Sequence, residues 1–305
     1  MKTTRHPAQR ALTRAPDWRS IAPMPAGVSA KSGRKMALLS PFRYPGGKTW
    51  LRPVVRQWLR NKVTILAEAF AGGGVTSITA LNEGLAQKAI MIERDRKVAS
   101  VWAGILNGEA DWLCRRIKKF KPTRKNVCKA LNKPANSTRE IIWTTLLRNR
   151  VNHGGVIAPG AGLLKKGEAG NGVKSRWYPN TLSERIKGIH LLKERISFRN
   201  VNAMTWLRSQ QKRKSKTRIA YFIDPPYSLA GKRLYTFGSI NHKKLFEIAS
   251  CLHGRVLMTY DDTAEIRKLA HEFGFKYRRV TMRSKHHVTK KELLISKNFK
   301  WLKNK

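Results

Sequence analysis

The chain has 305 residues, 41% of them hydrophobic, so it is long enough and apolar enough to bury a substantial core. Its 63 Lys and Arg residues against 18 Asp and Glu residues give a formal net charge of +45, which predicts a nucleic-acid partner. No apolar run reaches the ~20 residues of a membrane span, and three cysteines without paired spacing exclude a disulfide framework or a zinc site and favour a cytoplasmic location.

Residues 1–40 differ in composition from the rest of the chain. They contain a single acid, Asp17, and no apolar periodicity. We therefore expect a basic, disordered N-terminal arm that lies along phosphates. An Arg-rich, acid-poor start also resembles an organelle transit peptide, and Met36 would open a shorter chain if the start site were misplaced.

The next segment predicts the first half of a nucleotide-binding α/β unit. A Pro-Gly-Gly turn at 45–47 precedes helical spacing at 51–59, and a strand at 64–70 leads through the glycine loop 71–74 into a helix at 75–82. A second strand at 89–93 ends in Glu93, 20 residues after Gly73, where an acid accepts hydrogen bonds from ribose hydroxyls. No Gly-Lys-Ser/Thr or G-x-G-x-x-G spacing is present, so an adenosine cofactor without a pyrophosphate fits best.

Residues 111–179 interrupt the alternation of strands and helices. The segment holds a basic helix-like piece at 112–120 and a helix whose start is marked by Ser137 and Glu140, the spacing of a capping box. A glycine-rich, lysine-rich stretch follows at 152–179 and is typical of a mobile loop or hairpin that faces a nucleic-acid backbone. We interpret the region as an inserted recognition subdomain.

The remainder returns to the sheet through a helix at 182–192. Further strands are predicted at 196–199, 219–223, 256–260, 277–282 and 292–296, which makes seven with the first two. The strand Ile219–Ile223 is apolar throughout and reads as buried on both faces. Pro225 and Pro226 end it, so Asp224 and Tyr227 stand at its carboxyl end, where open α/β sheets bind ligands. An ordinary strand-ending turn is the alternative interpretation.

Three motifs stand in the order "FRYPGGK" (42–48), "AEAFAGGGV" (67–75) and "DPPY" (224–227). This ordered set resembles the Dam-like (D12 class) adenine-N6-specific DNA methyltransferases, and "VLMTYDD" and "KELLIS" resemble late strands of that family. The resemblance implies an α/β, Rossmann-like, seven-stranded S-adenosylmethionine-dependent methyltransferase sheet. It assigns 41–110 and 180–300 to the catalytic domain and 111–179 to an inserted target-recognition region.

The resemblance also implies roles for individual residues. Lys48 would meet the carboxylate of S-adenosylmethionine and Glu93 its ribose, while Asn202 stands where the family has an aspartate that accepts from the cofactor adenine. The complete set of implied cofactor-binding residues is Tyr44, Gly47, Lys48, Phe70, Ala71, Gly72, Gly73, Glu93, Asn202 and Asp224.

The chemistry of the DPPY motif supports catalytic roles for Asp224, Pro225, Pro226 and Tyr227. The adenine N6 lone pair is delocalised into the ring, and a site helps by accepting hydrogen bonds from both N–H protons. The Asp224 carboxylate and the Pro225 carbonyl are the two acceptors, and the prolines hold that carbonyl in place. Tyr227 offers a flat face for a base flipped out of the duplex.

Contacts to DNA are expected in the insert. The candidates are Arg148, Arg150, Asn152, Lys165, Lys166 and Arg176, with a solvated basic surface as the alternative for the whole set. The expected partner is double-stranded DNA, with a cognate restriction nuclease as a further candidate. The protein itself is expected to be a monomer of bacterial or phage origin that associates with the nucleoid. An RNA (ribosomal) adenine-N6 methyltransferase and a catalytically dead, DNA-binding methyltransferase fold are the competing functions.

Overall fold

The computed structural model describes residues 39–43, 47–158, 160–167, 170–213, 217–226, 240–283 and 289–302. Tyr44, Tyr227 and almost all of the predicted arm at 1–40 lie outside the described residues. The helices are α2 (Arg52–Trp58), α3 (Val75–Asn82), α4 (Arg96–Leu106), α5 (Ala110–Lys119), α6 (Arg124–Asn132), α7 (Thr138–Val151), α8 (Pro179–His190), α9 (Ala203–Gln210), α11 (His242–Ser250) and α12 (Ala264–Glu272). The strands are β1 (Val63–Ala69), β2 (Ala86–Ile92), β3 (Ile196–Arg199), β4 (Ile219–Ile223), β5 (Arg255–Asp261), β6 (Lys276–Arg283) and β7 (Thr289–Ser296).

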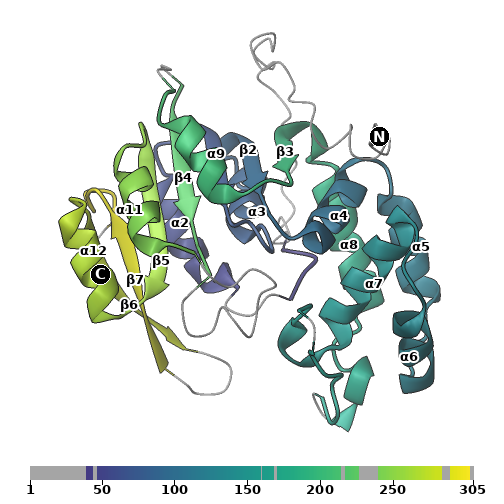
Figure 1. The fold of residues 1–305 in the computed structure, drawn as a ribbon. Coiled ribbons are helices and arrows are strands. Elements are labelled where there is room, and N and C mark those ends of the chain that lie inside the picture. The colour runs from purple at the N-terminus through teal and green to yellow at the C-terminus, as the bar shows by residue number, and fades with distance from the viewer. Residues whose placement is uncertain are drawn as a thin grey trace, which may run out of the picture.

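The strands form one seven-stranded sheet in the order β3-β2-β1-β4-β5-β7-β6 (Figure 1). Strands β1 to β5 pair in parallel, whereas β7 runs antiparallel to both of its neighbours. This order with its one reversed strand is typical of the class I S-adenosylmethionine-dependent methyltransferase fold. The predicted fold class and all seven predicted strands are confirmed, with strand ends that differ by a few residues.

Side chains of the central strands alternate between the two faces of the sheet, and helices cover both faces. In β4, Ile219, Tyr221 and Ile223 pack against α9, α11 and α12. Ala220 and Phe222 point the other way, toward α2 and the 3₁₀ turn at Lys48–Leu51. A strand buried on both faces carries apolar side chains at every position, which is why β4 reads as a continuous apolar run.

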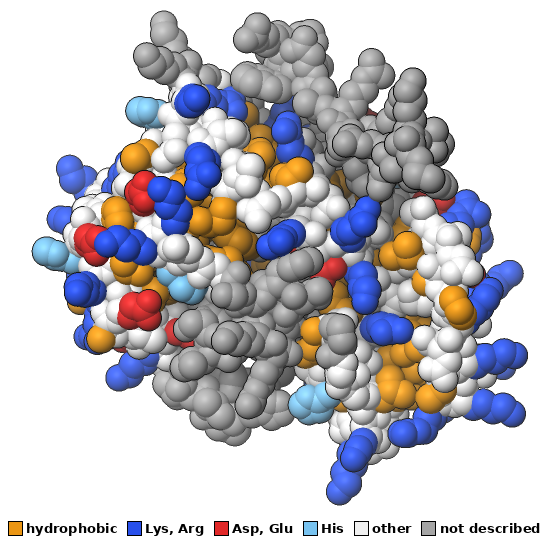
Figure 2. Space-filling view, in the orientation of Figure 1, with side chains coloured by type: hydrophobic (Ala, Val, Ile, Leu, Met, Phe, Trp, Pro, Cys, Tyr) orange, Lys and Arg blue, Asp and Glu red, His pale blue; other side chains and the backbone are white. Residues whose placement is uncertain are grey.

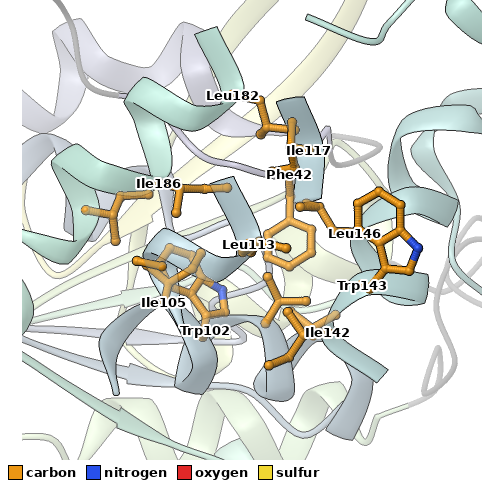
Figure 3. Packing of buried hydrophobic residues seen from close by; sticks show 14 of the residues in the cluster. Phe42, Trp102, Ile105, Leu113, Ile117, Ile142, Trp143, Leu146, Leu182 and Ile186 are labelled. Carbon is orange, nitrogen blue, oxygen red and sulfur yellow. The ribbon is translucent and has the colours of Figure 1, made fainter. Parts of the chain in front are cut away.

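Helices α4 to α8 form a lobe beside the sheet (Figure 1). Helix α7 begins with the predicted capping box, in which the Ser137 hydroxyl accepts from Glu140 N–H and the Glu140 carboxylate accepts from Ser137 N–H. The lobe buries Trp102, Leu113 and Trp143 in one cluster that also contains Met91 of β2, and Figure 3 shows Phe42 inserted among these helices. Helices α4 to α8 therefore share a core with the sheet.

None of the helices within the described ranges has the combined length and apolar character required to cross a membrane.

Candidate active site

The sheet register brings the predicted site residues to one edge. Ala69 of β1 pairs with Ile92 of β2 on one side and with Ile223 of β4 on the other. The next residue of each strand is therefore at the same carboxyl edge, which collects the glycine loop, Glu93 and Asp224. Topology alone thus assembles side chains that are far apart in the sequence.

A cavity of about 620 Å³ opens at this edge, a size typical of small-molecule sites. It is lined by the predicted cofactor-binding residues Gly47, Lys48, Phe70, Ala71, Gly72, Gly73, Glu93, Asn202 and Asp224, and by Pro226. Pro225 follows Asp224 in the chain without lining the cavity. The part of the chain that the structure describes holds no cluster of three or more metal-ligating side chains.

Backbone geometry and the residues behind it fix the glycine loop. Phe70 has a positive φ of 61°, which is strained for a bulky side chain and marks the sharp exit from β1. At Gly74, φ is 62° and an added Cβ would lie 2.4 Å from the Met91 side chain. The Trp102 indole donates to the Gly72 carbonyl at 2.9 Å from behind. Backbone of the loop can therefore approach a ligand closely.

Glu93 also holds this loop. Its carboxylate accepts from Gly72 N–H at 2.9 Å and from Asp95 N–H at 2.8 Å. Burial raises the pKa of Glu93, and the backbone donors of Asp95 and Gly72 oppose that shift. Each carboxylate oxygen has more than one lone pair, so these contacts are compatible with the predicted bonds from ribose hydroxyls.

Glu68 lines the same cavity and is absent from the sequence prediction. It is buried in β1, where its carboxylate accepts from Thr76 N–H at 3.3 Å and Ser77 N–H at 2.7 Å in the first turn of α3. Burial raises the pKa of Glu68 to about 7, although the donors from Ser77 and Thr76 favour the charged form. The sequence signal that could have identified Glu68 is an acid inside a strand of mainly apolar residues.

Replacing Glu68 with glutamine is expected to change how stability depends on pH. Because the pKa of Glu68 rises from 4.5 in the unfolded chain to about 7 in the fold, its stabilising contribution is complete below pH 4.5 and is lost as pH rises through 7. Between pH 5 and 8 the wild type should therefore lose about 2 to 3 kcal/mol more unfolding free energy than Glu68→Gln. Urea unfolding at several pH values measures this difference, and parallel stability profiles for the two proteins would contradict it.

Asp224 is held by a buried polar network at the end of β4. The Thr259 hydroxyl donates to Asp224 Oδ1 at 2.6 Å, and Lys48 Nζ lies 3.2 Å from the same oxygen. Lys48 Nζ also lies 3.2 Å from Glu292 Oε2, with Lys48 and Glu292 only 5% and 1% exposed. Burial alone would lower the pKa of Lys48, but Asp224 and Glu292 more than offset it, so the pKa is raised and the ammonium stays charged.

This network revises the expectation for Lys48. The resemblance implies that its ammonium meets the cofactor carboxylate, whereas the structure places it between Asp224 and Glu292. A buried ammonium that already bridges two carboxylates is electrically satisfied there. Lys48 therefore acts on Asp224, and neither Thr259 nor Glu292 was in the predicted site.

Asn202 caps helix α9. Its side-chain carbonyl accepts from Met204 N–H at 2.8 Å and from Thr205 N–H at 3.3 Å. The resemblance gives this carbonyl to the amino group of the cofactor adenine, and that contact stays a prediction beside the capping role that the structure shows. Asn202 also lines the cavity, and its side-chain amide N–H₂ is a donor.

Two of the predicted DNA contacts are interior residues. Arg150 is 2% exposed, donates to the Pro41 carbonyl, and has its pKa lowered to about 9 by burial and by Arg185 and Arg43. Asn152 is 4% exposed and donates to the Val156 carbonyl at 2.8 Å. Side chains buried against their own backbone do not reach a phosphate, so these two assignments are corrected to structural roles.

The other predicted contacts remain at the surface to different degrees. Arg148 is half-buried and donates to the Leu131 carbonyl at 3.2 Å, which ties α7 to the end of α6. Arg176 is half-buried, and Lys165 and Lys166 are exposed. The two lysines thus keep the accessibility that their predicted role requires.

A second interior amide, Asn149, fixes the chain within the first motif, at Arg43. Its carbonyl accepts from Arg43 N–H at 2.8 Å, and its amide donates to the Arg43 carbonyl at 2.9 Å and to the Gly155 carbonyl at 2.8 Å. At Gly155, φ is 77° and an added Cβ would lie 2.1 Å from the Arg43 carbonyl oxygen. This Asn149 clamp holds a segment that lines the cavity.

Comparison with known proteins gives distant structural likenesses alone. No family model matches the chain, and no curated protein matches it. A putative RNA methyltransferase from Pyrococcus horikoshii is 12% identical with a TM-score of 0.38, over 84% of this chain and 84% of that chain. An rRNA methylase from Streptococcus thermophilus is 10% identical with a TM-score of 0.35, over 80% and 93%. TrmK from M. capricolum, solved with S-adenosyl-homocysteine, is 8% identical with a TM-score of 0.34, over 80% of this chain and 68% of that chain.

The assignment of the fold itself rests on the strand order and the reversed β7.

Proposed function

We propose that this protein transfers a methyl group from S-adenosylmethionine to the N6 amino group of adenine in DNA. The observation that carries the proposal is the meeting of two half-sites in one cavity. The glycine loop and Glu93 form an adenosine-binding half, and Asp224, held by Thr259 and Lys48, forms an acceptor half. A methyl donor and an amino group bound there would share one enclosed volume.

The residues of the cavity fit the cofactor. The close-approach glycine loop accommodates the amino acid portion, Glu93 accepts from the ribose, and the Asn202 amide donates to a ring nitrogen of the cofactor adenine. The buried carboxylate of Glu68 favours a cationic ligand in the cavity. When bound, the cofactor supplies an electrophilic methyl group on a sulfonium.

The chain then has to orient the target nitrogen. The Asp224 carboxylate and the Pro225 carbonyl accept its two N–H bonds and turn its lone pair toward the methyl carbon. Asp224 or water would take the surplus proton from the target nitrogen once that nitrogen had accepted the methyl group, and the sulfonium would leave as a neutral thioether. Orientation of this kind can be worth effective molarities on the order of 10⁵ M.

The order of the three motifs, with a long insert before DPPY, favours DNA as the substrate. The high positive charge is equally suited to ribosomal RNA, which makes RNA adenine-N6 methylation the alternative.

Methyl transfer from labelled S-adenosylmethionine tests the proposal. Unmethylated duplex DNA and ribosomal RNA are offered separately, and nucleoside mass spectrometry identifies the product. We expect N6-methyldeoxyadenosine from DNA. Label that appears in RNA alone would replace this proposal with the RNA reading, and label in neither would favour a dead methyltransferase fold that binds nucleic acid.

A further inference from the structure

The outer surface of the inserted lobe carries a dense set of cations on α5, α6 and the turn between them. Residues 112–139 contain no Asp or Glu. We define the α5–α6 basic face by eight exposed side chains: Arg115, Arg116, Lys118, Lys119, Lys121, Arg124, Lys125 and Lys129. Blue side chains project along the edge of the molecule where α5 and α6 lie (Figures 1 and 2).

Neighbouring carboxylates do not neutralise this face. Within the described ranges, none of the eight side chains is in an ion pair, whereas Lys133 pairs with Glu140 at 3.0 Å and Arg139 with Glu109 at 2.8 Å. Exposed cations crowded together repel one another. The fold thus keeps acids at the border of the face and leaves its centre uncompensated.

The start of α6 shows that folding alone does not favour this arrangement. Arg124 and Lys125 occupy its first turn, which contains no acid, and Thr123 caps it. The positive end of the helix dipole disfavours cations there. Val127 is the single side chain of α6 that is fully buried, so packing adds little to offset this cost. A negatively charged partner at this face would remove the electrostatic cost of placing Arg124 and Lys125 there.

We propose that the α5–α6 basic face binds the sugar-phosphate backbone of duplex DNA beyond the base that enters the cavity. The choice of DNA rests on the proposed function. Helix α7 links this face to the cavity, because Arg148 donates to the Leu131 carbonyl at the end of α6 and Asn149, its neighbour, holds Arg43 at the cavity. The face therefore holds the duplex in a fixed position relative to Asp224.

Two quadruple variants separate a local site from net charge. The first is Lys118→Gln, Lys119→Gln, Arg124→Gln and Lys125→Gln, in which glutamine preserves helix propensity. The control removes four exposed cations elsewhere, with Arg60→Gln, Lys62→Gln, Lys268→Gln and Lys276→Gln. Both proteins are compared with the wild type by thermal unfolding, by affinity for S-adenosylmethionine, and by binding to a 30-base-pair duplex, roughly three helical turns, across a series of salt concentrations.

The first variant should bind DNA at least about tenfold more weakly at low salt, with a salt slope about 3 to 4 units shallower. The control should keep the wild-type slope to within about one unit, and both should bind the cofactor normally. Equal losses of DNA affinity in the two variants would overturn the proposal. A first variant that lost affinity only for duplex RNA of the same sequence would also overturn it. Wild-type protein that binds DNA through this face without methylating it would overturn the proposed function alone.

Discussion

Replacing Asp224 with asparagine is expected to lower the rate of methyl transfer by about 10³-fold, with little change in affinity for S-adenosylmethionine. Asparagine keeps the size of the side chain but replaces one acceptor oxygen with a donor, so the target amino group meets an N–H₂ where a carboxylate should accept. Single-turnover methylation with labelled cofactor measures the rate, and calorimetry measures cofactor binding.

The matched control is Asp111→Asn, which removes one exposed carboxylate at the start of α5 and should leave the rate unchanged. Thr259→Val should fall between the two, because it removes the hydroxyl that donates to Asp224 Oδ1 and leaves the carboxylate in place. An Asp224→Asn protein with wild-type activity would exclude this aspartate from the reaction.

The second large effect is expected on stability. Lys48→Met leaves the buried Glu292 and the neighbouring Asp224 without their shared cation, which should cost about 3 to 5 kcal/mol of unfolding free energy near neutral pH. Urea unfolding with two independent probes measures the loss.

The double variant Lys48→Met, Glu292→Gln identifies its cause. If the loss comes from an uncompensated carboxylate, neutralising Glu292 as well should recover about half of it or more. A double variant as unstable as the sum of the two single variants would show that shape and packing at Lys48 matter more than charge.

Local patterns predicted most of the sheet because each parallel strand is a short apolar run that ends in a polar or glycine-rich turn. Strands β3 and β4 have the predicted ends, and helix α3 spans the predicted 75–82. Helices α9, α11 and α12 were not predicted, and each begins at a single polar cap: Asn202, Asn241 and Thr263. One cap residue gives a weaker signal than a capping box.

The site was predictable as far as it depends on neighbours in sequence. The glycine loop, Glu93 and Asp224 each stand at the end of a strand, and strand ends converge in a parallel sheet. Thr259 and Glu292 contact the site from β5 and β7, and pairing of distant strands leaves no local pattern to read. Arg150 was misassigned because a helix rotates about 100° per residue, so a small error in its face exchanges surface for interior.

The Asn149 clamp has a consequence for engineering. Recognition regions are attractive parts to exchange between enzymes, since a foreign insert would in principle bring a new target sequence. Here the predicted insert, residues 111–179, supplies the amide that hydrogen-bonds to both backbone groups of Arg43 and the glycine that leaves room for its carbonyl. A chimera would have to reproduce this amide and this glycine in the donor segment, or its catalytic half would lose a wall of its own cavity. Residues 111–179 thus cannot be exchanged independently of the rest of the chain.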